Sequence, residues 1–228
     1  TSNTNILLKK LSNQNDIVIG TPVSGRDSSE LQEQIGFYIN TIPLRSVIEG
    51  ESTFKEVLID QRNNLLTSYD YQHFPFEKLV EELQPKRDMS RSPIFDVMVV
   101  LQNFDVIEER NFQIEDSLKL SKIESSYGNT KYDLTFSFSQ SNGQIQLELE
   151  YNTDLFNENT IERMCTQFER VLRQTVDDLN VPIKGVSMVS DDDAKKLTSK
   201  LDRSGVKYQT HETILSRFEA QVSKNPNC

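Results

Sequence analysis

Cysteine is scarce in this sequence, and its scarcity excludes two classes of small stabilised domain. Only two cysteines, Cys165 and Cys228, occur among the 228 residues. Two are too few for a disulfide framework or a zinc site. Cys165 falls within a helical pattern, and Cys228 is the last residue. A reducing compartment fits this usage best, so we expect a cytoplasmic protein.

Long apolar runs are also missing. No hydrophobic stretch approaches the roughly 20 residues that a helix needs to cross a bilayer, so no membrane partner is expected. Eight glycines and seven prolines are too few for a linker or a collagen-like chain. Hydrophobic residues make up 36% of the sequence and charged residues 26%. This balance permits a packed core and suits one large domain, or one domain with a small neighbour.

Basic residues are outnumbered by acidic ones. The sequence has 25 Lys and Arg against 35 Asp and Glu, which gives a formal net charge of −10. No nucleic-acid partner is expected, because phosphates require a cationic face. The first residues carry neither the charged nor the apolar region of a signal peptide, nor an initiator methionine. We therefore expect the chain to begin inside a longer polypeptide.

Hydrophobic periodicity predicts an alternation of strands and helices. Apolar runs at 16–23 and 94–101 predict buried strands. Residues 132–138 and 145–151 alternate in polarity around Ser141-Asn142-Gly143, which predicts a β-hairpin. The other predicted elements are a helix that ends near 11, a short helix at 27–36 with capping-box spacing between Asp27 and Glu30, a strand at 36–45, helices at 53–69, 76–83 and 157–179, a short helix from 191, and a helix at 210–224. This order indicates an α/β (α+β two-layer) fold, a mixed sheet with helices on a face.

The groups that would form an independent catalytic centre are missing. The two histidines, His73 and His211, lie far apart and have no acid at ligand or triad spacing, so we interpret both as turn or surface residues. There is no Walker loop and no dinucleotide-binding fingerprint. Ser24-Gly25-Arg26 lacks the flanking glycine of a nucleophile elbow. The residues by themselves predict no metal and no directly bound cofactor.

Six segments, in order, resemble signature blocks of condensation domains in nonribosomal peptide synthetases. The clearest is Gly36–Thr41 with Leu44-Arg45, which is similar to the family block IGxFVNT…R. The others are residues 16–26 (DIVIGTPVSGR), 71–77 (YQHFPFE, where the family has HQDYPFE), 87–95 (RDMSRSPIF, where Ser92 replaces Asn), 131–134 (KYDL) and 149–156 (LEYNTDLF). Residues 211–226 are similar to the opening of an adenylation domain.

The resemblance implies one lobe of a chloramphenicol-acetyltransferase-like fold, in which two similar lobes form a V around a tunnel. Carrier proteins deliver donor and acceptor on phosphopantetheine arms, and the acceptor amine attacks the donor thioester to form an amide. The family's HHxxxDG motif belongs to the amino-terminal lobe and is absent here. We therefore expect residues 1–180 to be the C-terminal lobe, 181–209 a linker and 210–228 the start of an adenylation domain. The chain alone is expected to be inactive.

The resemblance also implies roles for individual side chains. Arg26 is expected to form a salt bridge to the aspartate of the missing histidine motif, the alternative being an ordinary surface arginine. Tyr38 and Asn40 are expected to bind substrate on one side of a strand, while Phe37 and Ile39 on the other side pack into the core. Asn40 suits the amide-rich pantetheine arm, or equally a buried amide that satisfies a bulge.

Two further segments have alternative interpretations. The connector with Arg87, Asp88, Ser90 and Arg91 is expected to be held by local side-chain bonds. Residues 103–128 lie where the family sends a latch across to the partner lobe, but their polarity also suits a plain surface loop.

The expected partners are the N-terminal lobe, the donor and acceptor peptidyl carrier proteins, and the adenylation domain. An epimerisation or cyclisation domain is a second interpretation. A non-catalytic platform that docks carrier or adenylation domains is a third.

Overall fold

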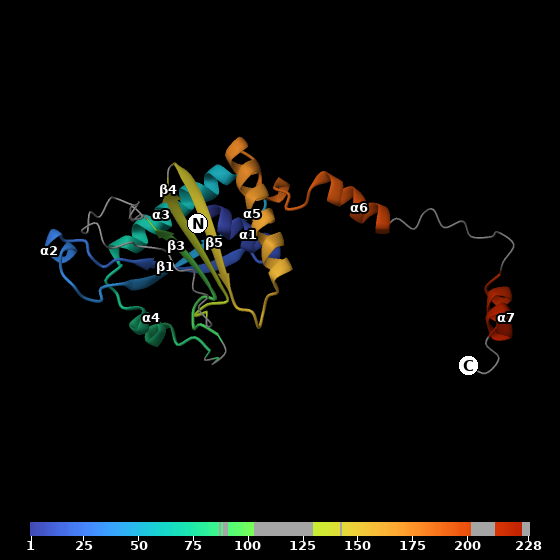
Figure 1. The fold of residues 1–228 in the computed structure, drawn as a ribbon, viewed down its shortest axis with the longest axis horizontal. Coiled ribbons are helices and arrows are strands. Elements are labelled where there is room, and N and C mark those ends of the chain that lie inside the picture. Colours follow the sequence, from blue (N-terminus) through green and yellow to red (C-terminus); the bar gives the residue numbers. More distant parts are fainter. Residues whose placement is uncertain (87, 89–90, 103–129, 142, 202–212, 225–228) are drawn as a thin grey trace, which may run out of the picture. The chain divides into compact units, whose positions relative to one another are not determined.

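The structure is a computed structural model that describes residues 1–86, 88, 91–102, 130–141, 143–201 and 213–224. The chain divides into two compact units, Thr1–Met188 and Val189–Cys228. The first unit holds a sheet and its helices (Figure 1). The second holds α6 (Asp191–Leu201) and α7 (Ile214–Lys224). Within the described ranges, no helix has both the length and the apolar character that crossing a membrane requires.

A five-stranded mixed sheet forms the centre of the first unit. β1 pairs antiparallel with β2 and parallel with β3, β3 pairs parallel with β4, and β4 pairs antiparallel with β5. The strand order across the sheet is β2 (Asn40–Val47), β1 (Asp16–Val23), β3 (Val97–Gln102), β4 (Leu134–Ser141) and β5 (Gln144–Tyr151). The predicted mixed sheet and its hairpin are confirmed.

One face of the sheet is apolar and carries the core. Because side chains alternate along a strand, Ile17 and Ile19 of β1 point to the same face. They belong to a buried cluster with Phe136 of β4 and with Phe168 of α5 (Glu158–Asp177). The helices α1 (Ser2–Ser12) and α3 (Phe54–Asp70) add Leu7 and the partly buried Leu65 to this cluster.

Side-chain caps set where the two long helices begin. The Thr53 N–H donates to the Glu56 carboxylate at 2.8 Å, and the Glu56 N–H donates to Thr53 Oγ1 at 3.3 Å, which completes a capping box. Asn157 Oδ1 accepts a bond from the Thr160 N–H at 2.9 Å. These bonds satisfy N–H groups that lack a partner in the first helical turn. The helices predicted from residues 53 and 157 therefore begin where the sequence indicated.

A second buried cluster ties the residues after α5 to the first unit. Ile183 and Val186 are buried with Phe54 of α3, and the Phe54 N–H donates to the Val181 carbonyl at 3.0 Å. Residues 181–188 therefore pack as part of the first unit, although the sequence suggested a linker from 181 onward.

The segment before β2 departs from the predicted strand at 36–45. The strand begins only at Asn40, whose partner Val23 is the last residue of β1. The backbone after Val23 leaves the extended conformation at Gly25, which has a φ of +63°, so the residues before Asn40 have no strand to pair with. Phe37 and Ile39, expected in the core, are instead 89% and 56% exposed. The expectation that these two side chains pack inside is therefore wrong.

The short helix before this segment is smaller than predicted. α2 spans Ser29–Gln32, and its N-cap is Ser28, whose side chain makes no capping bond. The predicted capping box between Asp27 and Glu30 is therefore wrong. Asp27 contacts a distant histidine instead.

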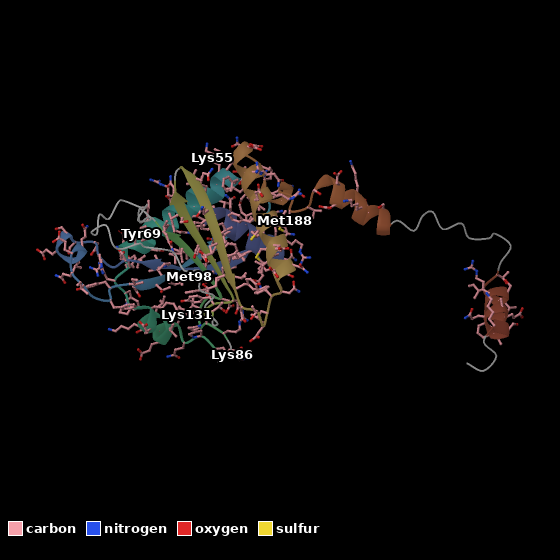
Figure 2. All side chains as sticks on the ribbon, in the orientation of Figure 1. Lys55, Tyr69, Lys86, Met98, Lys131 and Met188 are labelled. Carbon is pink, nitrogen blue, oxygen red and sulfur yellow. The ribbon has the colours of Figure 1, made fainter. Side chains whose placement is uncertain are left out.

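The opposite face of the sheet is partly covered by α4 (Phe76–Leu83). Met98 of β3 (Figure 2) alternates with two core residues and is buried on this second face, at 6% exposure. The Phe95 ring lies over Gly20 of β1 so closely that a Cβ there would come within 2.1 Å of it. Phe95 also contacts the Phe76 ring of α4, with centroids 5.6 Å apart.

Candidate functional site

A groove of about 970 Å³ lies beside α4. Its lining residues come from the segment before β2, from the connector that leads into α4, from the segments before β3 and β4, and from the residue after β5: Gly25, Leu31, 37–41, Gln72, His73, 75–77, 91–93, Asp96, 130–133 and Asn152. Tyr38 and Asn40, the two substrate-binding residues predicted from the sequence, both line it.

Asn40 fastens the α3–α4 connector to the start of β2. Its Nδ2 donates to the carbonyl oxygens of Gln72 and Phe74, both at 2.8 Å. Its Oδ1 accepts a bond from the Phe76 N–H at 3.2 Å, which is one of the N–H groups left without a partner at the start of α4. Both amide donors are thus engaged by backbone. This arrangement favours the structural interpretation of Asn40 over direct contact with a pantetheine arm.

Arg26 organises the segment that carries α2. Its guanidinium donates to the carbonyl oxygens of Leu31, Gln34 and Gly36, the last at 3.1 Å. These bonds use three of its five N–H donors. The same guanidinium lies 4.5 Å from the centroid of the Tyr38 ring, a cation–π contact. Arg26 is therefore more than an ordinary surface arginine, and this fastening role has no signal in the sequence.

Tyr38 closes the same segment. Its hydroxyl donates to Gln34 Oε1 at 2.8 Å. Gly25 has a φ of +63°, and a Cβ there would lie 2.2 Å from the Tyr38 carbonyl oxygen. Glycine is therefore required beside Arg26, because both the left-handed backbone and the close approach exclude a side chain.

His73 has an acidic partner that the sequence does not reveal. Its Nε2 lies 2.8 Å from Asp27 Oδ2, across a separation of 46 residues. The hydrogen bond with His73 is the main cause that lowers the pKa of Asp27. The two side chains are exposed, at 64% and 48%, so the description of His73 as a partly exposed turn residue holds. His211 lies outside the described residues.

Charged and aromatic side chains gather at the other end of the groove. Arg91 pairs with Asp96, which is the local bonding predicted for that connector; Arg87 and Ser90 lie outside the described residues. Burial, followed by the charge of Asp96, raises the pKa of Asp133. Phe95 and Tyr132 place their ring centroids 5.5 Å apart. The buried Phe95 ring therefore packs behind Tyr132, which lines the groove beside Asp133, a carboxyl group that is harder to ionise than usual.

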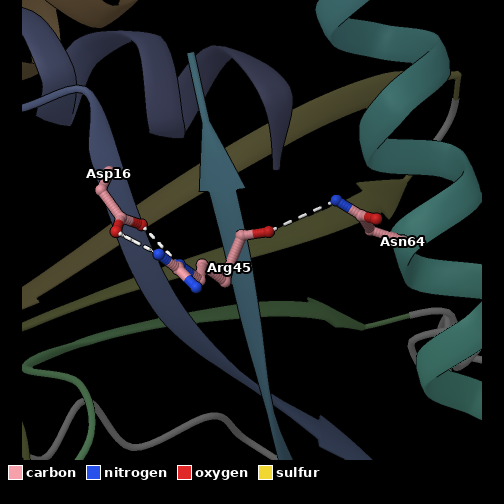
Figure 3. A network of polar contacts seen from close by, with 3 residues as sticks. All are labelled: Asp16, Arg45 and Asn64. Atoms are coloured by element: carbon pink, nitrogen blue, oxygen red, sulfur yellow. Dashed lines mark hydrogen bonds and ion pairs between the residues drawn. The ribbon is translucent and has the colours of Figure 1, made fainter.

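A separate polar network joins the edge strand β2 to β1 and α3 (Figure 3), and none of its three residues lines the groove. Arg45 Nε donates to Asp16 Oδ1 at 2.9 Å and its Nη2 donates to Oδ2 at 2.8 Å. Asn64 Nδ2 donates to the Arg45 carbonyl at 3.4 Å. The hydrogen bond with Arg45 lowers the pKa of Asp16. The arginine of the Leu44-Arg45 block thus joins β2 to β1.

Metal chemistry has no support in the described ranges, which contain no group of three His, Cys, Asp or Glu side chains able to hold an ion. The predicted latch at 103–128 lies outside these ranges.

Comparison with known families identifies the chain. The family model described as "Condensation domain" matches residues 2–198. The chain belongs to the condensation-domain family. The resemblance of its six segments to condensation-domain blocks is thereby confirmed.

Curated relatives of this condensation-domain chain are much longer proteins. Bacitracin synthase 3 of Bacillus licheniformis is 37% identical over 220 residues, which are 96% of this chain and 3% of that protein. Tyrocidine synthase 3 of Brevibacillus parabrevis is 37% identical over 222 residues, 97% of this chain and 3% of that protein. The chain therefore spans only a small fraction of the relatives that it matches.

Solved structures confirm the condensation-domain fold. A four-domain nonribosomal peptide synthetase, holo-AB3403 bound to AMP and glycine, matches with a TM-score of 0.76 and 26% identity, over 85% of this chain and 16% of that one. The X-domain from teicoplanin biosynthesis matches with a TM-score of 0.71 and 23% identity, over 82% of this chain and 43% of that one. The second likeness concerns the fold alone.

All six condensation-domain segments contribute to the groove. Each contains at least one lining residue, and the blocks at 16–26 and 149–156, which are far apart in the sequence, supply Gly25 and Asn152. The fold therefore brings the family's signature residues to one place.

Proposed function

We propose that this chain is the C-terminal lobe of a condensation domain in a nonribosomal peptide synthetase and forms one wall of its reaction tunnel. The observation that carries the proposal is the meeting of all six signature segments at one groove. The match to the X-domain structure covers 43% of the X-domain chain. A match to somewhat less than half of that chain supports the interpretation of the present chain as one of two lobes.

In the proposed reaction, the amine nitrogen of a carrier-bound acceptor attacks the carbonyl carbon of a carrier-bound donor thioester. The C–N bond forms, the C–S bond breaks, and the donor's phosphopantetheine leaves as a thiol. The amine loses its proton to a base. The HHxxxDG histidine of the N-terminal lobe is the proposed group for this proton or for placing the amine, since this sequence contains no His-His pair.

The role of this chain is to shape and position. Arg26 is proposed as a positioning residue: it holds its own segment through three carbonyl groups and has further N–H donors to offer the aspartate of the histidine motif. Tyr38 and Asn40 are proposed to line the acceptor side of the tunnel. Both are also engaged in holding its wall, so they act on substrate through the shape of the groove.

The proposed partners follow from the proposed role as one lobe of a condensation domain. Ile35, Phe37 and Ile39 are exposed at 103%, 89% and 56%, and such an apolar strip suits a protein neighbour. We assign it to the N-terminal lobe. Carrier proteins would deliver both substrates on phosphopantetheine. Residues 210–228 are proposed to open an adenylation domain, and the whole assembly to work in the cytoplasm.

A reconstitution with separate lobes tests this function. This chain, a purified N-terminal lobe, and two loaded carrier proteins are combined, and amide product on the acceptor carrier is followed by mass spectrometry. We expect product only when both lobes are present. Product from this chain alone, or no product from the intact synthetase, contradicts the proposal.

Substitution of Arg26 tests the proposed position of the arginine. In the intact synthetase, Arg26→Ala and Arg26→Lys are both expected to lower turnover at least about tenfold, since lysine lacks the planar fork that reaches several acceptors. Normal turnover in either variant, with an unchanged unfolding midpoint, rejects the role. Arg173→Lys, on the exposed surface of α5, is the matched control.

A docking platform is the second candidate. A solved complex of the X-domain and OxyB from teicoplanin biosynthesis contains a chain that matches this one with a TM-score of 0.71. A chain of this fold can therefore take part in a complex with another protein. Carrier-protein binding by this chain without the N-terminal lobe, and no rise in amide yield when that lobe is added, favours the platform. An epimerisation or cyclisation domain instead predicts an inverted or heterocyclic product.

A further inference from the structure

A histidine that lines the groove contacts an aspartate from a distant segment. His73 Nε2 lies 2.8 Å from Asp27 Oδ2. His73 belongs to the connector between α3 and α4 and lines the groove itself. Asp27 does not line the groove, but it lies close in sequence to Gly25, which does, and next to Arg26, whose guanidinium is bonded to the carbonyl groups of Leu31, Gln34 and Gly36. The pair therefore links the connector to a segment that Arg26 anchors.

A second set of bonds joins the connector to the start of β2. Asn40 bonds to the backbone of Gln72, Phe74 and Phe76. The Asp27–His73 contact is a separate bond between two exposed side chains, so its loss leaves the bonds of Asn40 in place.

The histidine of the pair differs from the family block that this segment resembles. In YQHFPFE, His73 stands where HQDYPFE has an aspartate, and Tyr71 stands where that block has histidine. With an aspartate at position 73, two carboxylates would face each other and repel. The histidine converts that contact into an attractive one.

We infer that Asp27 and His73 form a positioning clasp that sets the entrance of the groove for the arm of a carrier-bound acceptor. The inference rests on the proposed function for what passes the entrance, but not for the contact itself.

Other titratable groups share the groove. Tyr38, Glu77 of α4, Arg91, Asp96, Lys131, Tyr132 and Asp133 also line it. Arg91 and Asp96 are paired with each other. None of these other groups is a cause of the lowered pKa of Asp27, for which the causes are the bond to His73, its charge, backbone N–H groups and an opposing burial effect.

The contact itself is tested in the 228-residue chain by a double-mutant cycle. Urea unfolding of Asp27→Ala, His73→Ala and the double variant is measured. We expect the effects of the two substitutions on the free energy of unfolding to be non-additive, because each one removes the same contact. Additive effects overturn the clasp, whatever the catalytic result.

The positioning role is tested in the intact synthetase. His73→Ala and Asp27→Ala are expected to raise KM for the loaded acceptor carrier about two- to fivefold, the range that an exposed pair allows, with kcat unchanged. The swapped variant Asp27→His/His73→Asp is expected to restore KM. Glu169→Ala, which breaks an exposed Glu169–Arg173 pair on α5, is the matched control and leaves KM unchanged.

The outcomes separate the two proposals. A coupled pair whose loss leaves KM unaltered overturns the positioning role. A parallel fall in kcat, with no rescue by the swap, also overturns it. A synthetase with unaltered residues that makes no amide rejects the proposed function and with it the acceptor's use of this entrance, while the cycle in the 228-residue chain still decides whether the clasp exists.

Discussion

At the scale of single residues, two side chains, Asn40 and Arg26, fix the segments around the groove by bonding to backbone. Asn40 and Arg26 together make six hydrogen bonds to main-chain groups of two segments. Backbone partners fix the path of a loop directly, which a pair of flexible side chains does less well. Such residues determine the shape of a site without touching what binds there.

Asn40→Ala tests how much this fastening stabilises the chain. The change leaves two carbonyl groups and one N–H of the connector without their partner, so we expect the free energy of unfolding to fall by about 1–3 kcal/mol. Urea unfolding measures it. Asn64→Ala removes a single long bond of 3.4 Å from an exposed side chain and is expected to change stability by less than about 0.5 kcal/mol. Equal effects of the two substitutions would contradict the assignment.

Asp133 gives a prediction about pH. Burial raises its pKa, so the folded chain holds this proton more tightly than the unfolded chain, and the ionised form costs stability at neutral pH. Asp133→Asn is therefore expected to raise the free energy of unfolding at pH 7. The gain should shrink as the pH falls through the raised pKa, and vanish below the unfolded value of about 3.9.

Urea midpoints at pH 7 and pH 4 measure this difference. Asp154→Asn, an exposed carboxylate outside the groove lining, is the control and should show no such gain. A lower midpoint for Asp133→Asn at pH 7 would indicate that the ionised carboxylate has a favourable partner.

At the scale of elements, the second face of the sheet depends on one close approach. Phe95, before β3, reaches over Gly20 of β1 and meets Phe76 at the start of α4. This stack places α4 and the connector beside the sheet. The absence of a side chain at Gly20 is therefore what allows the groove wall to lie where it does.

Gly20→Ala tests that approach. A Cβ at this position would lie 2.1 Å from the Phe95 ring, so the ring must move, and we expect a loss of about 1–3 kcal/mol in unfolding free energy. Gly50→Ala, where the nearest atom would be 3.7 Å away, should change stability by less than about 0.5 kcal/mol. Denaturation curves compare the two, and an unaffected Gly20→Ala variant would show that the ring does not lie over this strand.

At the scale of the whole molecule, the first unit has a complete core on one face and an exposed apolar strip beside its groove. Phe37 is 89% exposed, an uncommon state for a large aromatic side chain next to a signature block. A partner that covers this strip would explain the exposure. The N-terminal lobe is the partner that the proposed function supplies.

Phe37→Ser tests the partner. The side chain makes little contact within the chain, so the unfolding free energy should change by less than about 0.5 kcal/mol. Association with a separate N-terminal lobe, measured by calorimetry, should weaken at least about tenfold, as for loss of a central aromatic contact. Ile145→Ser, 74% exposed on the edge strand β5, is the control. Equal affinity of Phe37→Ser and the unaltered chain would place the lobe elsewhere.

The sequence alone determined the elements and the family. Strand β1 and helices α3, α4 and α5 follow from apolar spacing and caps within a few residues, since these signals are local. The six signature segments were visible as blocks in order. The sequence therefore predicts the residues whose role is local, such as helix caps and the apolar positions of a helix or strand.

Only the tertiary structure decided what these segments do together. It ended the strand predicted at 36–45 early, since β1 has no partner to offer before Asn40, and it exposed Phe37. It paired Asp27 with His73 over a separation of 46 residues and directed Asn40 onto the connector. The spacing of apolar residues indicates which side chains share a face of a helix or strand. It does not indicate which distant segment of the chain will lie next to them, because the packing of the whole sheet determines that contact.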